Sequence, residues 1–93
     1  MLLEFSHTVK GSLKMDHEIY KSATKNALKQ LRLDAQITQK QLASLINKPQ
    51  SFISKYENGD RDIDFVTVYL VCSALRRDLN NFQELFESYI PGR

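Results

Sequence analysis

The sequence has only one cysteine, three glycines and two prolines, and it has no tryptophan. A lone cysteine, Cys72, cannot form an intramolecular disulfide, so the composition fits a reducing cytoplasm. Because Gly and Pro mark turns, their scarcity argues against a β-sandwich of many short strands. The composition therefore favours helices that are joined by short turns.

Long apolar segments are also missing. The longest uncharged, largely apolar run, residues 65–75, is too short to cross about 30 Å of hydrocarbon. The chain does not open with the basic and apolar regions of a secretory signal. Hydrophobic residues make up 42% and charged residues 26%, which is typical of a globular domain and excludes a disordered or collagen-like chain. We expect one soluble, cytoplasmic domain that does not bind membranes; the net charge of +2 does not identify a partner by itself.

Residues 1–14 have a different pattern, in which apolar and polar residues alternate from Leu3 to Val9 and the alternation ends at Gly11. One interpretation is a frayed arm or an added leader, since Met15 could itself be an initiator. The other is an edge strand that pairs across a dimer. We expect residues 1–18 to form a flexible arm or leader, residues 19–90 the domain, and residues 91–93 a short tail.

From Ile19 onward the apolar spacing becomes helical and predicts a helix over residues 19–33. Thr38 and Gln41 form a capping box, so a second helix begins at Gln39. Asn47 is able to end this helix, since Asn tolerates a positive φ. The inward face of the first helix is predicted to comprise Tyr20, Ala23, Ala27, Leu28 and Leu31.

Further start signals predict three more helices and hence an all-α bundle. Pro49 suits the entry of a third helix over residues 50–58, which Gly59 closes. Asp64 is able to cap a fourth helix that reaches about Arg76. A fifth helix is expected from Asn81 to about Tyr89, with Asn80 or Asn81 as its cap. The inward face of the fourth helix is predicted to comprise Phe65, Val68, Val71, Cys72 and Leu75.

The second helix, a turn of about three residues and the third helix have the geometry of a helix-turn-helix. Ala43 is small where the two helices would cross closely, and Asn47 suits a left-handed turn. Ile53 is apolar where the third helix must be anchored. Each feature is common by chance, but their joint spacing is not.

Residues 28–32, 37–43 and 49–59 resemble the lambda-repressor-like Xre family, and residues 72–75 resemble the end of that family's fourth helix. The resemblance covers roughly residues 19–90. It implies a five-helix lambda-repressor-like DNA-binding domain in which the third helix lies in the major groove of double-stranded DNA. The implied base-contacting residues are Gln50, Ser51 and Lys55.

The resemblance also implies contacts that carry no sequence information. The expected phosphate-contacting residues are Gln39, Lys48, Asn58 and Arg61. Arg32 and Glu57 are expected to form a partly buried ion pair that ties the first helix to the third.

The sequence departs from the family pattern at two turns. Gln36 stands where glycine often follows the first helix, and Arg76 stands where glycine often ends the fourth. A left-handed Gln would cost about 1 kcal/mol, so we expect a remodelled turn at Gln36. We expect the fourth helix to continue or to end differently at Arg76.

A homodimer is predicted from apolar residues that one small core does not need. These are Val66, Tyr69 and Leu70 of the fourth helix and Phe82, Phe86 and Tyr89 of the fifth. The alternative is a monomer in which the fifth helix simply packs on the fourth.

The resulting hypothesis is a sequence-specific transcriptional regulator, most simply a repressor, that binds DNA as a homodimer. The alternatives are the antitoxin of a toxin–antitoxin pair, which a co-transcribed toxin gene would favour, and a protein-interaction module with the same fold. An enzyme is not expected, because capping and solvation explain Asp62 and Asp64. One cysteine and two histidines do not supply a metal site. No cofactor is expected, nor a small-molecule ligand, since no effector domain follows the fifth helix.

Overall fold

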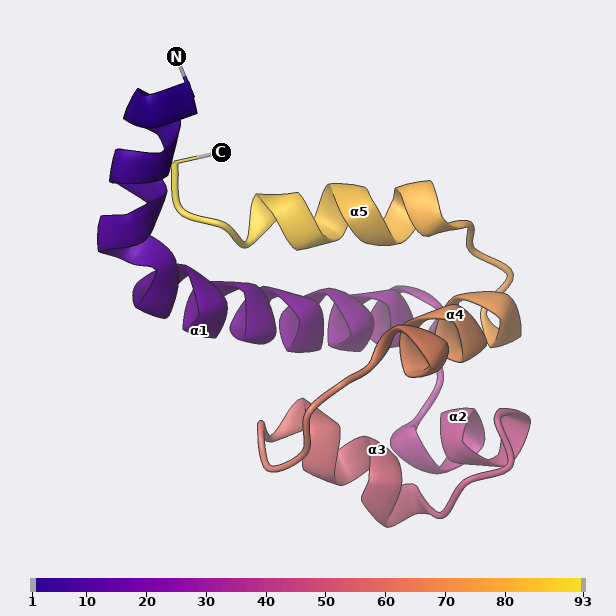
Figure 1. Ribbon diagram of the computed structural model, residues 1–93. Coiled ribbons are helices and arrows are strands. Elements are labelled where there is room, and N and C mark those ends of the chain that lie inside the picture. Colours follow the sequence, from indigo (N-terminus) through magenta and orange to yellow (C-terminus); the bar gives the residue numbers. More distant parts are fainter. Residues whose placement is uncertain (1, 93) are drawn as a thin grey trace.

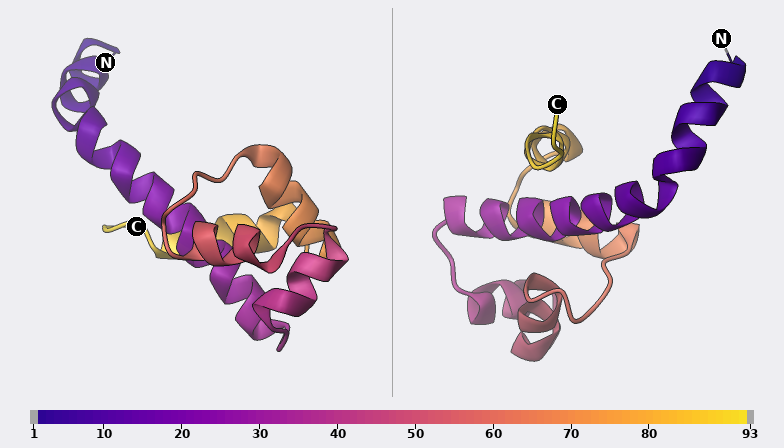
Figure 2. Two further views of the ribbon diagram at one scale, coloured as in Figure 1. Left: turned by 90° about the horizontal axis from the view of Figure 1, so that it is seen from below. Right: turned by 90° about the vertical axis from the view of Figure 1, so that its left-hand side faces the viewer.

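The computed structural model describes the backbone of residues 2–92 and the side chains of residues 17–92. Within this part of the chain there are five helices and no strand (Figure 1). α5 lies along one side of α1, whereas α2 and α3 lie on its other side (Figures 1 and 2). The helices are α1 (Leu2–Asp34), α2 (Gln39–Leu45), α3 (Gln50–Glu57), α4 (Phe65–Ala74) and α5 (Leu79–Ser88).

α1 is much longer than the helix predicted over residues 19–33, because it begins at Leu2. The interpretation of residues 1–14 as an edge strand is therefore wrong for residues 2–14, which are helical. The first turns of α1 bend away from the rest of the domain (Figures 1 and 2). The side chains that suggested the alternation, Leu3 to Val9, lie outside the described side chains. That residues 1–18 act as an arm or leader stays a prediction.

The apolar core lies where α1, α2, α3 and α4 meet. Removing this surface from water is the main force that holds the helices together. Cys72 belongs to the core, and its burial raises the pKa of the thiol. Tyr20 is the exception to the predicted inward face, because it is largely exposed and contacts Phe86 of α5. The largest fully buried side chains are Leu28, Leu42, Ile53, Tyr56 and Val71.

Two helix starts are as the sequence predicts. The Thr38 hydroxyl accepts a hydrogen bond from the backbone N–H of Gln41 (3.0 Å), and Oε1 of Gln41 accepts one from the backbone N–H of Thr38 (2.8 Å). This capping box confirms that α2 begins at Gln39. Asp64 caps α4 by accepting a hydrogen bond from the Thr67 N–H (2.8 Å), and this bond lowers the pKa of the Asp64 carboxyl.

The prediction for the start of α5 is wrong by two residues. Asp78, rather than Asn80 or Asn81, is the N-cap, and α5 begins at Leu79. Oδ1 of Asp78 accepts a hydrogen bond from the Asn81 N–H (2.9 Å), while Oδ1 of Asn81 accepts one from the Asp78 N–H (3.0 Å). Asn81 therefore completes a second capping box as its third helical residue.

The first four helices all end in the same way. In each, the residue after the C-cap has a left-handed φ, and two backbone hydrogen bonds close the Schellman motif. For α1, the Gln36 N–H donates to the Leu33 carbonyl (2.9 Å) and the Ile37 N–H to the Arg32 carbonyl (3.4 Å). The left-handed residues are Gln36 (φ 59°), Asn47 (φ 58°), Gly59 (φ 84°) and Arg76 (φ 57°).

The expectation of a remodelled turn at Gln36 is therefore wrong, as is the expectation of a continued helix at Arg76. Both residues adopt the left-handed conformation that glycine adopts without strain, and α4 ends at Ala74. The two Schellman hydrogen bonds outweigh the strain of the left-handed residue, because the last carbonyls of the helix would otherwise lack hydrogen-bond partners.

None of the described helices has both the length and the hydrophobicity to span a bilayer.

Candidate nucleic-acid interface

The packing of α2 against α3 fixes which side of α3 faces outward. Ile53 and Tyr56 project into the core and are almost completely buried. Ala43 of α2 is also buried, and its small side chain lets the two helices approach closely. The left-handed Asn47 turns the chain between the helices, as predicted.

The opposite side of α3 is open to solvent. The predicted base-contacting residues Gln50, Ser51 and Lys55 are all exposed on it. Pro49 is the N-cap of α3, and no side chain caps the amides of the first turn. The three side chains together present hydrogen-bonding groups on one exposed surface.

The α2–α3 unit carries net positive charge. Between residues 36 and 59 the basic residues are Lys40, Lys48 and Lys55, and all three are exposed. The single acidic residue of this stretch, Glu57, is buried and paired with Arg32. The α2–α3 unit therefore presents an uncompensated positive surface, which suits a polyanion.

The predicted ion pair between Arg32 and Glu57 is present. Nε of Arg32 lies 2.7 Å from Oε2 of Glu57, and Nη2 lies 3.0 Å from Oε1. Only 7% of Arg32 and 6% of Glu57 are exposed. A third guanidinium nitrogen, Nη1, donates to the Ile37 carbonyl at 2.8 Å. The bond to Glu57 raises the pKa of Arg32, so the guanidinium stays charged.

Gln39, a predicted phosphate contact, also forms a hydrogen bond within the domain. Its Nε2 donates to Oε1 of Glu57 at 2.9 Å, which engages one of the two N–H groups of the amide. The half-buried side chain therefore joins α2 to the Arg32–Glu57 pair, and one N–H remains for an outside acceptor.

The other three predicted phosphate contacts lie at the two ends of α3. Asn58 is the exposed C-cap of α3, Lys48 lies in the turn before the helix, and Arg61 lies in the loop after it. Nζ of Lys48 lies 5.1 Å from the centre of the Phe52 ring, and Cζ of Arg61 lies 4.5 Å from it. The sequence analysis does not assign these cation contacts to Phe52. An aromatic residue between basic residues in a polar stretch is a sequence signal for them.

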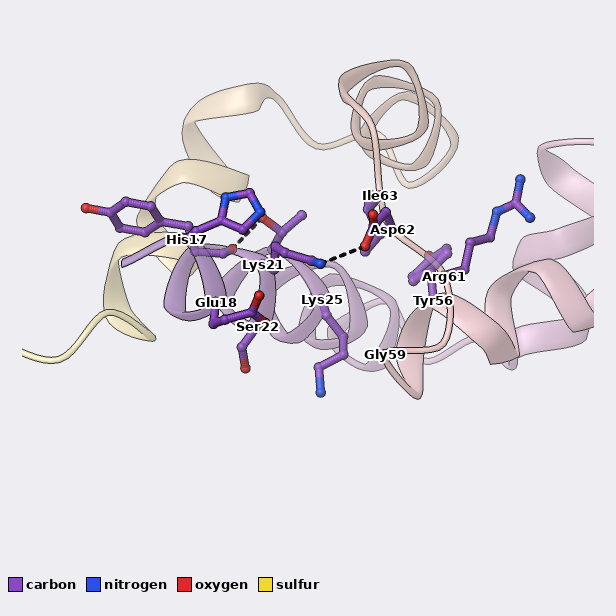
Figure 3. Close-up of a pocket in the computed structure, with 12 residues that line it drawn as sticks. His17, Glu18, Lys21, Ser22, Lys25, Tyr56, Gly59, Arg61, Asp62 and Ile63 are labelled. Carbon is purple, nitrogen blue, oxygen red and sulfur yellow. Dashed lines mark hydrogen bonds and ion pairs between the residues drawn. The ribbon is translucent and has the colours of Figure 1, made fainter. Parts of the chain in front are cut away.

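A cleft separates α1 from the loop that follows α3 (Figure 3). Lys21 and Asp62 form an ion pair across it at 3.1 Å, whereas Arg61 points away from it (Figure 3). Tyr56 lines the cleft, and its hydroxyl is buried without a hydrogen-bond partner in the described part of the chain. Burial raises the pKa of this hydroxyl, so Tyr56 stays neutral.

The predicted dimer residues divide into two groups. Val66 (63% exposed), Tyr69 (56%), Leu70 and Tyr89 are exposed, whereas Phe82 and Phe86 are half-buried and stack on each other with ring centres 5.8 Å apart. Phe65 is 65% exposed, so its predicted inward position is wrong. It is the first residue of α4, where the helix extends beyond the core.

An apolar cleft continues this exposed surface of α4. It lies between the beginning of α4 and α5, beside the central part of α1. The residues that give it its apolar character are Ile63, Phe65, Val68, Leu79, Phe82 and Phe86.

Comparison with known proteins gave two findings. A protein-family model described as helix-turn-helix matches residues 28–82, which include all of α2, α3 and α4. Among solved structures, the crystal structure of the clp gene regulator ClgR from C. glutamicum is similar, with a TM-score of 0.69 and 21% sequence identity. The similarity covers 76% of this chain and 91% of that one, and at this identity it shows the fold. A search of curated protein sequences found no match.

Proposed function

This chain belongs to the helix-turn-helix family, of the Xre or lambda-repressor-like type, which supports a DNA-binding regulator of transcription. On this premise we propose that it recognises a specific sequence in double-stranded DNA, binds it as a homodimer and acts as a repressor.

The outward side of α3 carries this proposal. Gln50, Ser51 and Lys55 are exposed together, while Ile53 and Tyr56 anchor the helix in the core. A helix held in this way is able to enter the major groove without rearrangement of the domain. There Gln50 would pair bidentately with adenine, and Lys55 would donate to O6 and N7 of guanine.

Phosphate contacts would fix the position of α3 in the groove. Lys48, Asn58 and Arg61 flank the helix and are exposed. Gln39 would use its remaining N–H for a phosphate oxygen while it braces Glu57. Such contacts supply affinity for any sequence, and base contacts add the specificity.

The exposed apolar surface of α4 supports the homodimer. Phe65, Val66, Tyr69 and Leu70 are exposed, and no charged residue occurs in α4. A surface of this kind is unfavourable in water and is typical of a protein–protein interface. A two-fold axis through it would repeat α3 and would match a pseudo-palindromic site with half-sites about 34 Å apart.

Repression is the simplest mode of action, because occupancy of an operator blocks other proteins from the same DNA. It requires no contact beyond those to DNA and to the second subunit. The antitoxin alternative shares this DNA-binding surface, so the two differ by an additional protein partner.

Selection of bound sequences from a random duplex pool tests the proposal. We expect one enriched sequence with two inverted halves, whose centres are separated by about one helical turn. Enrichment of a single half-site would contradict the homodimer. No enrichment at any salt concentration would contradict DNA recognition and would favour a protein-interaction module.

A further inference from the structure

Two cations from different segments of the chain meet on one aromatic ring. Lys48 comes from the turn before α3, and Arg61 comes from the loop after it. Both lie over Phe52 of α3, with Nζ of Lys48 at 5.1 Å and Cζ of Arg61 at 4.5 Å from the ring centre. The two charges are therefore gathered beside the helix, although they are 13 positions apart in the sequence.

In the described part of the chain, neither Lys48 nor Arg61 has a carboxylate within ion-pair distance, and Asp64 attracts Arg61 only at longer range. Both side chains are exposed. The negative face of an aromatic ring attracts each cation, but it does not cancel the repulsion between two of them. The cluster is thus suited to an anion that would approach from solvent.

The ring that both cations contact is held in place. Phe52 is half-buried and packs against the core. It also meets Tyr56 edge to face, with ring centres 6.0 Å apart and an angle of 88° between the planes. Because Tyr56 is almost completely buried, Phe52 has a fixed partner behind it. The ring is therefore a fixed platform on which the long side chains of Lys48 and Arg61 rest.

We propose that Phe52 is a positioning residue that arranges Lys48 and Arg61 into one binding site for phosphodiester groups of the DNA backbone. The proposal rests on the DNA-binding function proposed above. Lys and Arg side chains lose much conformational freedom when they bind, and ordering before binding reduces this loss. Phe52 thus contributes to DNA affinity without touching DNA.

The test replaces Phe52 with Leu, which keeps apolar volume but removes the aromatic face. The matched control is Phe52→Tyr, which keeps the ring. Binding to a random-sequence 20-base-pair duplex is measured at several salt concentrations. We expect Phe52→Leu to weaken binding by about two- to fivefold for each cation that no longer rests on a ring, and Phe52→Tyr to bind like the wild type.

A double-mutant cycle separates positioning from a merely structural role. Lys48→Ala is measured in the wild-type and in the Phe52→Leu background, at a temperature at which thermal melting shows all variants to be folded. We expect Lys48→Ala to cost less affinity in the Phe52→Leu background, because Lys48 is no longer ordered there. In the free protein, the NMR signals of the Lys48 side chain should lose their ring-current shift in Phe52→Leu and keep it in Phe52→Tyr.

The outcomes distinguish the two proposals. If the wild type binds duplex DNA but Phe52→Leu binds equally well, the positioning role of Phe52 is wrong and the DNA-binding function stands. Additive effects of Phe52→Leu and Lys48→Ala would likewise overturn it. If the wild type binds no duplex, the DNA-binding function and this inference are both wrong.

Discussion

Arg32 of α1 and Glu57 of α3 are joined by two parallel hydrogen bonds of 2.7 and 3.0 Å. Glu57 also accepts a hydrogen bond from Gln39 at the start of α2, so one carboxylate connects three helices. Because α3 ends at Glu57, this connection fixes the end of α3 relative to α1 and α2. The position of the proposed recognition surface therefore depends on a pair of charges that are buried away from it.

We expect Glu57→Ala to destabilise the protein strongly. Removal of one partner leaves a buried guanidinium unpaired, which typically costs about 3–5 kcal/mol. Urea denaturation without DNA measures the effect. Asp62→Ala is the control, because it breaks the exposed Lys21–Asp62 pair and should have little effect. Equal stability of wild type, Glu57→Ala and Arg32→Ala would show that the pair is not structurally important.

Two substitutions at the left-handed residues that follow the helix ends should change the stability of the protein in opposite directions. Arg76→Gly should increase the free energy of unfolding by up to about 1 kcal/mol, since glycine removes the strain at φ 57°. The greater freedom of glycine in the unfolded chain will offset part of this gain.

Gly59→Ala is the reciprocal variant. It should lower stability by about 1 kcal/mol, because an alanine at φ 84° is strained although its Cβ would meet only Lys25, at 3.9 Å. Chemical denaturation of both variants gives the two values. Loss of stability in Arg76→Gly would mean that the arginine side chain has a role at this position.

Asp64 should make stability depend on pH in the acidic range. The hydrogen bond from Thr67 lowers the pKa of Asp64 in the folded state, so this stabilisation is complete above its unfolded pKa. It is lost as the pH falls through the lower folded pKa. Between about pH 5 and pH 2, the melting temperature of Asp64→Asn should therefore fall less than that of the wild type. Asp60→Asn, which removes an exposed carboxylate that caps no helix, is the matched control.

Sequence predicts this fold best where the interaction is local. Thr38 and Gln41 are three residues apart, and their side chains and backbones alone form the capping box. The same reasoning misses Asp78 as a cap, because Asn80 and Asn81 are equally good capping residues nearby. At Arg76, propensity argues for a different helix end, but the Schellman hydrogen bonds impose a left-handed conformation on whichever residue stands there.

Features that join distant segments are harder to predict. Phe65 fits the inward face of a helical projection, yet it is exposed because no element covers the first turn of α4 on that side. The contacts of Phe52 with Lys48 and Arg61 depend on how the loop after α3 folds back, which no local pattern encodes. The Arg32–Glu57 pair is predictable through a family resemblance alone, since its members are 25 positions apart in the sequence.

The proposed dimer predicts a change of oligomeric state in α4 variants. Val66→Glu and Tyr69→Glu place a charge on the exposed apolar surface and should give folded monomers. These two positions test the dimer better than Phe86 does, because the Phe86 ring packs against Phe82 and Tyr20 within one subunit. Sedimentation at tens of micromolar is the measurement, and Leu45→Glu, an exposed apolar residue of α2, is the control. A monomeric wild type at this concentration would exclude the dimer.

Gln50 and Lys48 should differ in the kind of DNA affinity they provide. If Gln50 pairs with a base, Gln50→Ala should cost about 1–3 kcal/mol on the selected site and almost nothing on scrambled DNA. Lys48→Ala should weaken binding to both duplexes alike and reduce the salt dependence by about one counterion per half-site.

The loss of binding free energy that each variant causes should double in a dimer, because each half-site binds one copy of α3. Titration of both variants against selected and scrambled duplexes at several salt concentrations separates them. Lys29→Ala, which removes one exposed charge of α1 outside the α2–α3 unit, serves as the control. Equal losses on both duplexes for Gln50→Ala would remove Gln50 from base recognition and leave Ser51 and Lys55 as the candidates, since all three share the exposed side of α3.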